Sequence, residues 1–519
     1  MKRVSDLSGA VEGRVRPTRT WAVVAVAVAA HMLLWLDNSI LNIALETLAD
    51  PVRGLGANAG ELAWASSSYS LVLASAMFAG GALGDRYGPR ATLFAGLLVF
   101  SAASAFAAFS GSALELIVTR GLMGVGSALV IPATLSIIVR TTSDAQRSRA
   151  IALWASASGL GVALGPVLGG VLLARFWWGS VFLINVPIVL ACLVGVVAFV
   201  PRLTFADRRP LDPFGLVLSV LGLGSLVYGI IEGGQRADWL GVGVLVPLVL
   251  GVLLLVWFVL VQRSAEHPSF DVKLFAVRQF TGGSVALLFT FFGLTGQLFA
   301  TAFYLQGIRG LTPLGAGLVM VAAAVGIVVG NLVSPRITGW LTVRWTVVGG
   351  MLLAIATFAT YVTFDQGTSI AFLVVLLVVQ GFGMGMISAP ITTAMMAVLP
   401  PRVSGAGAAI NSAMRQVGGA LGTAVLGSVL TASYHRLITP SLARLPEAVR
   451  DQAAESAQGA RAVAARRREP RVPASDVHVL DLGDAAVADR GRVRHQLLPT
   501  GQVRTSWSWA FDTFRSSSR

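Results

Sequence analysis

Thirteen long apolar segments make up most of this 519-residue chain, and they constrain its fold more than any other feature. A helix that crosses a bilayer needs about 20 mostly apolar residues. Segments of this kind cover residues 20–45, 60–83, 91–109, 114–138, 150–174, 181–200, 213–232, 240–261, 280–306, 314–334, 345–363, 369–395 and 404–431. Charged residues make up 12% of the chain, against about 25% in soluble proteins. We therefore predict an all-α polytopic membrane protein.

Lysine and arginine are distributed unevenly between the loops that join these segments. Alternate loops, beginning with residues 1–19, carry 19 of these basic residues, and the other loops carry 4. Cytoplasmic loops of membrane proteins are enriched in Lys and Arg, so we predict that residues 1–19 are cytoplasmic. Membrane topology then explains the net charge of +14, and we predict no nucleic-acid partner.

The loop after the second segment combines one acid, two arginines and three glycines. These residues are Gly81, Gly84, Asp85, Arg86, Gly88 and Arg90. Glycine allows tight turns and close helix contact, and Asp85 can accept hydrogen bonds from arginines or from a helix N-terminus. A generic cytoplasmic turn is the simpler reading. The string resembles the loop signature of the major facilitator superfamily, except that Pro89 stands where that family usually has Arg or Lys.

Asp37 and Arg120 are charged residues that lie well inside apolar segments. Arg120 lies in the fourth segment, and Asp37 lies in the first, in a polar patch with Asn38 and Asn42. Ionisable residues within a membrane are costly and are functional hypotheses by default. A structural reading stays open for both. Arg120 can pair with Glu115 near the membrane interface, and Asp37 can belong to a satisfied polar cluster.

The fifth segment contains a string of glycines around one proline. The string consists of Gly161, Gly165, Pro166, Gly169 and Gly170. Glycines at every fourth position form a smooth groove against which another helix can pack closely, and proline bends the helix. An ordinary close-packed helix pair would explain the spacing alone. The full string resembles the antiporter motif of drug:proton exporters.

These strings together resemble the fourteen-span drug:proton antiporters (the EmrB/QacA type) of the major facilitator superfamily. Further matching strings extend the resemblance over about residues 20–431. The resemblance implies a major facilitator fold with a first six-helix bundle at 20–200, two inserted spans within 201–279, and a second bundle at 280–431. The second bundle contains five segments instead of six, so we predict that the last span is missing.

The remaining residues, 432–519, are polar and Arg-rich and contain no apolar run of span length. Such a stretch lacks the apolar content that would offset its chain entropy, so we predict a disordered tail. Its character changes abruptly near Arg466. We interpret this change as a frameshift after about residue 461, or as a natural truncation.

The resemblance implies a proton-coupled antiporter that exports drug-like molecules across the bacterial inner membrane, with Asp37 and Arg120 in proton coupling. It implies no cofactor, because a proton gradient supplies the energy, and the chain has no ATP-binding G-x-x-x-x-G-K-[ST] string. A major facilitator importer of a small metabolite is one alternative, and an exporter inactivated by its missing span is another. An enzyme is not indicated, because the five histidines form no catalytic pair or metal cluster.

Aromatic and polar side chains form the candidate substrate cavity between the predicted bundles. They are Trp35, Asn42, Tyr69, Trp154, Phe291, Phe292, Phe303, Tyr304 and Arg415. Aromatic walls suit flat or cationic molecules. Packing against lipid or other helices is the alternative for the aromatic residues, and Arg415 can be a hydrogen-bonded packing residue.

Overall fold

The computed structural model describes residues 17–202, 212–236, 238–264, 272–364, 367–400 and 403–442. Its helices are α1 (Pro17–Ala49), α2 (Ala59–Tyr87), α3 (Pro89–Ala108), α4 (Ala113–Thr141), α5 (Asp144–Arg175), α6 (Ser180–Leu183), α7 (Asn185–Phe199), α8 (Pro213–Arg236), α9 (Val242–Ser264), α10 (Arg278–Phe303), α11 (Pro313–Trp340), α12 (Val343–Thr360), α13 (Ile370–Ala397) and α14 (Ser404–Leu442). Within these ranges there is no strand. The predicted all-α fold class is confirmed.

Twelve candidate spans are long and apolar enough to cross a membrane, and they overlap the first twelve predicted segments. The thirteenth predicted segment, 404–431, is helical as part of α14 but does not reach the same apolar character. Its sequence explains the difference, because Asn411, Arg415 and Gln416 interrupt its apolar residues. α14 nevertheless packs along α2 and α10, so it belongs to the helical assembly.

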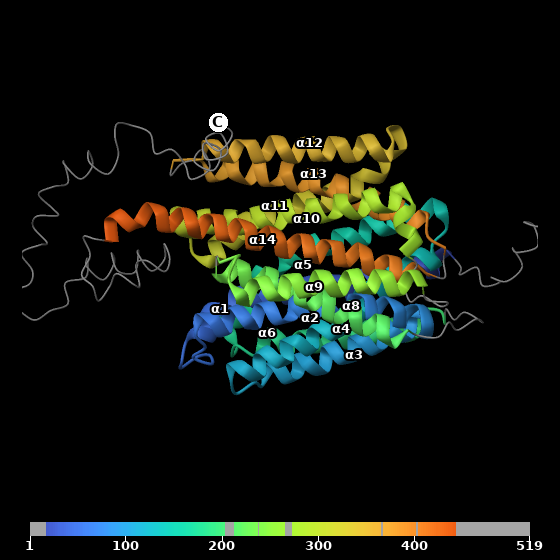
Figure 1. Ribbon diagram of the computed structural model, residues 1–519, viewed down its shortest axis with the longest axis horizontal. Coiled ribbons are helices and arrows are strands. Elements are labelled where there is room, and N and C mark those ends of the chain that lie inside the picture. The colour runs from blue at the N-terminus through green and yellow to red at the C-terminus, as the bar shows by residue number, and fades with distance from the viewer. Residues whose placement is uncertain are drawn as a thin grey trace, which may run out of the picture.

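Two groups of roughly parallel helices lie side by side in Figure 1, with α1 to α4 below and α10 to α13 above. α5 and α14 lie between them, and contacts across the seam run from α5 to α11 and from α2 to α14. The helices α8 and α9, which were predicted as inserted spans, pack against each other, and α8 contacts both α2 and α14. The α8–α9 pair therefore bridges the two groups.

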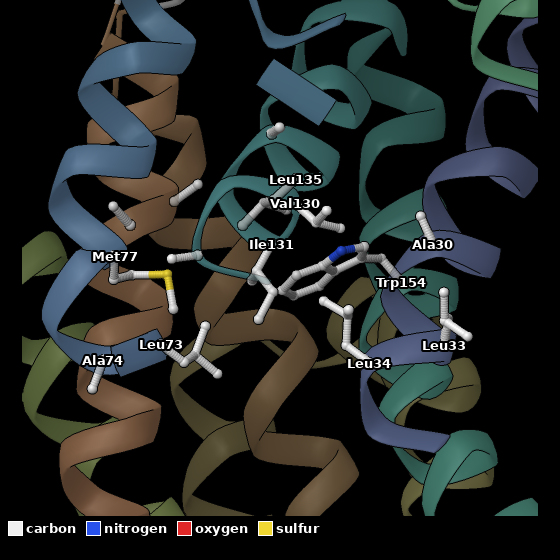
Figure 2. Packing of buried hydrophobic residues seen from close by; sticks show 14 of the residues in the cluster. Ala30, Leu33, Leu34, Leu73, Ala74, Met77, Val130, Ile131, Leu135 and Trp154 are labelled. Atoms are coloured by element: carbon white, nitrogen blue, oxygen red, sulfur yellow. The ribbon is translucent and has the colours of Figure 1, made fainter. Parts of the chain in front are cut away.

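The apolar core of the first group lies where α1, α4 and α5 meet. Figure 2 shows Trp154 of α5 between Leu34 of α1 and Ile131 of α4. The Trp154 side chain is 1% exposed, and its Nε1 donates a hydrogen bond to Thr134 Oγ1 at 3.0 Å. A buried indole needs such an acceptor for its N–H, so this contact fixes the orientation of the ring.

The turn between α2 and α3 follows directly from its sequence. Gly88 has a φ angle of 91°, which residues with a side chain rarely adopt. Pro89 begins α3, at a position where its missing N–H would have no helical acceptor. The proline that departs from the family string therefore suits the first turn of the next helix.

The predicted cytoplasmic N-terminus, residues 1–19, and the predicted disordered tail, residues 432–519, lie largely outside the described residues. α1 begins at Pro17, and α14 continues past the predicted end of its segment at 431 to Leu442. The frameshift after about residue 461 and the missing last span fall beyond Leu442, so both stay predictions.

Candidate functional site

Asp37 and Arg120, which the sequence places inside the first and fourth apolar segments, form an ion pair. Arg120 Nη1 lies 2.5 Å from Asp37 Oδ2, and the Arg120 and Asp37 side chains are 0% and 1% exposed. α1 and α4 therefore hold two opposite charges in the interior. Removing one member of such a pair typically costs about 3–5 kcal/mol, because it leaves the other charge buried and uncompensated.

Glu115, the alternative partner of Arg120, has a different role. Its carboxylate accepts a hydrogen bond from the Gly111 N–H at 2.7 Å, and its own N–H donates to Ser112 Oγ at 3.2 Å. Both contacts stabilise the N-terminus of α4, where an acid is favoured by the helix dipole. The sequence left the partner of Arg120 open, and the fold assigns Asp37.

Asn185, at the start of α7, completes the buried cluster. Its Nδ2 donates to Asp37 Oδ1 at 2.7 Å and to Ser104 Oγ at 3.0 Å. Each Asp37 oxygen therefore accepts a hydrogen bond, one from Arg120 and one from Asn185. Sequence reasoning did not assign Asn185 to this site. Its signal was an amide within an apolar segment.

Tyr69 connects the ion pair to a central cavity. The guanidinium carbon of Arg120 lies 4.6 Å from the centre of the Tyr69 ring, and the Tyr69 hydroxyl donates to Ser127 Oγ at 2.9 Å. The same tyrosine lines a cavity of about 490 Å³. A change in charge at Asp37 is therefore separated from the cavity by Arg120 and one aromatic ring.

The cavity lies where α1, α2, α4, α8, α10 and α14 face one another. Its wall includes four of the predicted residues, namely Trp35, Tyr69, Phe291 and Arg415. Neutral polar groups are contributed by Asn38, Ser66, Ser67, Ser70, Gln235, Thr295, Gln416 and Thr423. Its volume and its mixture of apolar and polar groups are typical of small-molecule sites.

A smaller cavity of about 100 Å³ lies beside the first and shares Trp35, Phe291 and Thr295 with it. Asn331 of α11 lines this second space and is 1% exposed. Neither its Oδ1 nor its Nδ2 has a hydrogen-bond partner in the described part of the chain. An unsatisfied buried amide costs about 1–3 kcal/mol, so a bound molecule or water here would gain hydrogen bonds.

Several predicted cavity residues lie elsewhere. Asn42 is exposed, one turn beyond Asn38 on α1. Phe303 is the last residue of α10 and Tyr304 follows it directly, about one turn past Phe299, which does line the cavity. The prediction for these three residues is revised, because each lies on a cavity-forming helix or directly after it, but none lines either cavity.

Trp154 and Phe292 are also not part of the wall. Trp154 lies behind it, where His31 stacks on its ring with a centroid separation of 4.2 Å. The guanidinium carbon of Arg415 lies 5.5 Å from the centre of the Trp154 ring. Trp154 therefore contacts Arg415, which lines the cavity, but does not line the cavity itself.

The loop motif connects the two groups of helices at one end of the molecule. Asp85 Oδ1 accepts hydrogen bonds from Arg140 Nη2 at 2.7 Å and from the Gly405 N–H at 3.0 Å, and Oδ2 accepts from the Ala406 N–H at 2.9 Å. Arg140 Nε also donates to Ser404 Oγ at 2.8 Å. Asp85 thus caps the N-terminus of α14, where a negative charge is favoured. Sequence reasoning counted Arg140 among the basic loop residues and missed this pairing.

The other residues of the motif have separate contacts. A side chain at Gly81 would place its Cβ 2.6 Å from the Gly405 carbonyl oxygen, whereas at Gly84 the nearest atom would be 3.9 Å away. Arg90 Nη2 donates to a carbonyl of α7 at 3.1 Å. The guanidinium carbon of Arg86 lies 5.4 Å from the ring centre of the following tyrosine. Gly81 is therefore the glycine that permits close contact between α2 and α14.

The regularly spaced glycines of α5 form its contact with α1. A Cβ at Gly161 would lie 2.7 Å from the Met32 carbonyl oxygen, and one at Gly165 would lie 2.4 Å from Ser39 Cβ. The contact at Gly169 is looser, with the nearest atom at 3.4 Å. The groove predicted from the four-residue spacing therefore holds α1.

Pro166 and Gly170 face α11 instead. A Cβ at Gly317 of α11 would lie 3.3 Å from the Pro166 ring, and one at Gly170 would lie 3.6 Å from Leu314. The glycine–proline string therefore contacts both groups of helices at once.

A buried ion pair beside a central cavity, within two groups of membrane-spanning helices, defines a multi-pass membrane transporter. The family model described as Major Facilitator Superfamily matches residues 27–423, and the chain belongs to this family. Members of the family are transporters and are generally not enzymes.

Curated relatives include several efflux and resistance proteins. The multidrug efflux pump LfrA of Mycolicibacterium smegmatis is 35% identical over 450 residues, which cover 86% of this chain and 88% of LfrA. The methyl viologen resistance protein SmvA of Salmonella typhimurium is 32% identical, over 89% of this chain and 92% of SmvA. The tetracenomycin C resistance and export protein of Streptomyces glaucescens is 31% identical, over 81% of this chain and 77% of the export protein.

Solved structures with the same fold are more distant in sequence. The human organic anion transporter MFSD10 aligns with a TM-score of 0.58 at 19% identity, over 79% of this chain and 93% of MFSD10. The proton:xylose symporter XylE aligns with a TM-score of 0.57 at 14% identity, over 82% of this chain and 91% of XylE. These similarities support the major facilitator fold.

Proposed function

We propose that this protein is a proton-coupled antiporter that exports drug-like molecules across a bacterial inner membrane, with its N-terminus in the cytoplasm. The observation that supports coupling is the buried Asp37–Arg120 pair, which Tyr69 joins to the central cavity. A proton on Asp37 would neutralise the carboxylate and leave Arg120 without a counter-charge. The guanidinium and the tyrosine ring that it contacts would then shift, and the cavity wall would shift with them.

The positions of the cavity and of the loop motif suggest the direction of transport. With the N-terminus in the cytoplasm, the contacts of Asp85 with Arg140 and α14 close the cytoplasmic end. Most lining residues fall in the later halves of α1, α8 and α10 and the earlier half of α2, so the cavity occupies the outer half. Alternating access would then require the Asp85 contacts to break when the outer side closes.

The names of the curated relatives support export over import. LfrA is named as an efflux pump and the Streptomyces glaucescens protein as an export protein. The glycine–proline string that contacts both helix groups is the feature that resembles the antiporter motif. A small-metabolite importer is the alternative, and it predicts movement in the opposite direction.

Everted membrane vesicles that contain the full chain test this proposal. Respiration acidifies the vesicle interior, and an exporter should then accumulate dye inside the vesicles. Three dyes cover the charge classes, namely fluorescein methyl ester (an anion), Nile red (uncharged) and rhodamine 123 (a cation). We expect accumulation of at least one dye, its abolition by a protonophore, and its loss in Asp37→Asn. Asp50→Asn, which changes an acid in the loop between α1 and α2, is the matched control and should accumulate dye normally.

Each other outcome identifies a different error in the proposal. Accumulation that persists in the presence of the protonophore would exclude proton coupling. Dye movement out of the vesicles would support the importer. No movement of any dye by protein that is folded and inserted would support an inactive exporter.

A further inference from the structure

Arg415 of α14 is a buried cation without a carboxylate partner. Its side chain is 5% exposed, and within the described ranges its nitrogens form no salt bridge to an acid at 4.0 Å or less. Its hydrogen bonds go to neutral groups, from Nε to Asn411 Oδ1 at 3.1 Å and from Nη2 to Thr392 Oγ1 at 2.8 Å. A charge held in this way within a membrane is costly, and it indicates a functional site by default.

Two other arginines with buried side chains, Arg120 and Arg140, do form salt bridges and show how this fold compensates such a charge. Arg120 pairs with Asp37 and Arg140 pairs with Asp85. The fold thus supplies a carboxylate to both, and each pair lies between helices. Arg415 differs, because the space beside it is a cavity instead of an acidic side chain. Its counter-charge can therefore come from a molecule in the cavity.

Arg415 is also the one charged residue in the described wall of either cavity. The rest of the wall is apolar, aromatic or neutral and polar. Charges interact strongly where the surroundings are poor in water. The wall therefore favours a negative group near Arg415 and opposes a positive one.

The two aromatic rings beside Arg415 strengthen this preference. Its guanidinium carbon lies 4.9 Å from the ring centre of Phe291 and 5.5 Å from that of Trp154. Ring faces attract cations, and here the arginine already occupies that role. The aromatic residues therefore hold Arg415 in place. The sequence alone suggested that their faces would bind a cationic substrate, but these two rings already contact the arginine.

We propose that Arg415 recognises the anionic group of a largely apolar, aromatic substrate, such as a carboxylate or an ionised phenol. This inference rests on the proposed function, because it names the substrate class of the proposed exporter. The anionic group binds at Arg415, and the apolar body fills the cavity between α1, α2 and α10.

Binding of two matched dyes to the purified full chain tests the charge preference. Fluorescein methyl ester and rhodamine 123 share one aromatic skeleton, but at pH 8 the first is an anion and the second a cation. Their fluorescence anisotropy, measured with protein in lipid nanodiscs and no proton gradient, gives the two dissociation constants. We expect the anion to bind roughly 10-fold more tightly or better, the scale of one charge-assisted hydrogen bond.

Two substitutions assign this preference to Arg415. Arg415→Gln should weaken binding of the anion roughly 10-fold and leave the cation unchanged or improved. Arg415→Lys keeps the charge and should retain most of the preference. The proposal would be overturned if the unmodified chain bound the cation as tightly as the anion, or more tightly. It would also be overturned if folded Arg415→Gln bound the anion with a dissociation constant within twofold of that of the unmodified chain.

The binding experiment is independent of transport. Asp50→Asn should bind the anion normally, because Asp50 lies in the loop between α1 and α2 and does not line either cavity. If the unmodified chain showed the anion preference but no proton-driven accumulation of any dye, the result would contradict the proposed function alone. Proton-driven accumulation of rhodamine 123 with no anion preference would contradict the role of Arg415 alone.

Discussion

Ser39 of α1 donates a hydrogen bond to the backbone carbonyl of Val162 in α5, with 2.9 Å between Oγ and O. Val162 lies four residues before Pro166, so its carbonyl is the one that the proline leaves without a helical N–H donor. A neighbouring helix thus satisfies the backbone group that the proline exposes. Such satisfaction matters in a membrane, where water cannot provide it.

Ser39→Ala should destabilise the protein, because it leaves the Val162 carbonyl without a donor. We expect a loss of about 1–3 kcal/mol, measured as a lower thermal unfolding midpoint of the purified protein. Ser75→Ala is the matched control, since Ser75 Oγ bonds to the Leu71 carbonyl of its own helix. An equal effect of the two substitutions would mean that the contact between helices has no special role.

Gly165→Ala should disrupt the contact between α1 and α5. Its Cβ would lie 2.3 Å from Ser39 Oγ and 2.4 Å from Ser39 Cβ, so one helix must move. The same substitution at Gly170 would place the nearest atom at 3.6 Å, an ordinary contact. We expect Gly165→Ala to lower dye accumulation in vesicles at least several-fold and Gly170→Ala to leave it within twofold. Similar activity of both variants would show that the groove is not needed.

A double variant can separate the effect of the Asp37–Arg120 pair on stability from its proposed role in proton coupling. Asp37→Asn or Arg120→Met alone should each cost about 3–5 kcal/mol, because one charge stays buried without its partner. Asp37→Asn combined with Arg120→Met should recover much of that stability, measured by thermal unfolding, because no charge is left. We expect the double variant to fold but not to transport in response to a proton gradient. Gradient-driven transport by the double variant would exclude the pair from coupling.

Gly81→Ala should open the end of the molecule that Asp85 closes. The new Cβ would lie 2.6 Å from the Gly405 carbonyl oxygen and 2.8 Å from Ala409 Cβ, which forces α2 away from α14. Gly84→Ala, with its nearest atom at 3.9 Å, is the control. Spin labels on the ends of α3 and α13 nearest this contact would report the separation of the two groups. We expect a longer distance in Gly81→Ala and no change in Gly84→Ala, and an unchanged distance in both would count against a closing contact.

Much of the fold follows from local features of the chain. The first twelve predicted segments overlap the twelve candidate spans, because length and apolar content alone decide whether a helix can cross a bilayer. The four-residue spacing of Gly161, Gly165 and Gly169 predicted a close helix contact, and α1 fills that groove. The thirteenth segment was harder to classify, because a helix that is buried between others can carry polar residues such as Asn411.

Partnerships between distant residues were decided by the tertiary structure. The sequence placed Asp37, Arg120 and Arg415 inside apolar segments but could not say which charge had a partner, since α1, α4 and α14 meet only in the folded chain. The fold pairs Asp37 with Arg120, adds Asn185, and leaves Arg415 facing a cavity.

The sequence by itself determined that the chain is a helical membrane protein with charged groups in its interior, because apolar length and the cost of a buried charge are properties of single segments. The tertiary structure decided which of those charges are neutralised within the protein and which aromatic residues form the cavity wall. Those outcomes depend on distances between helices that are far apart in the chain, and no local pattern specifies them.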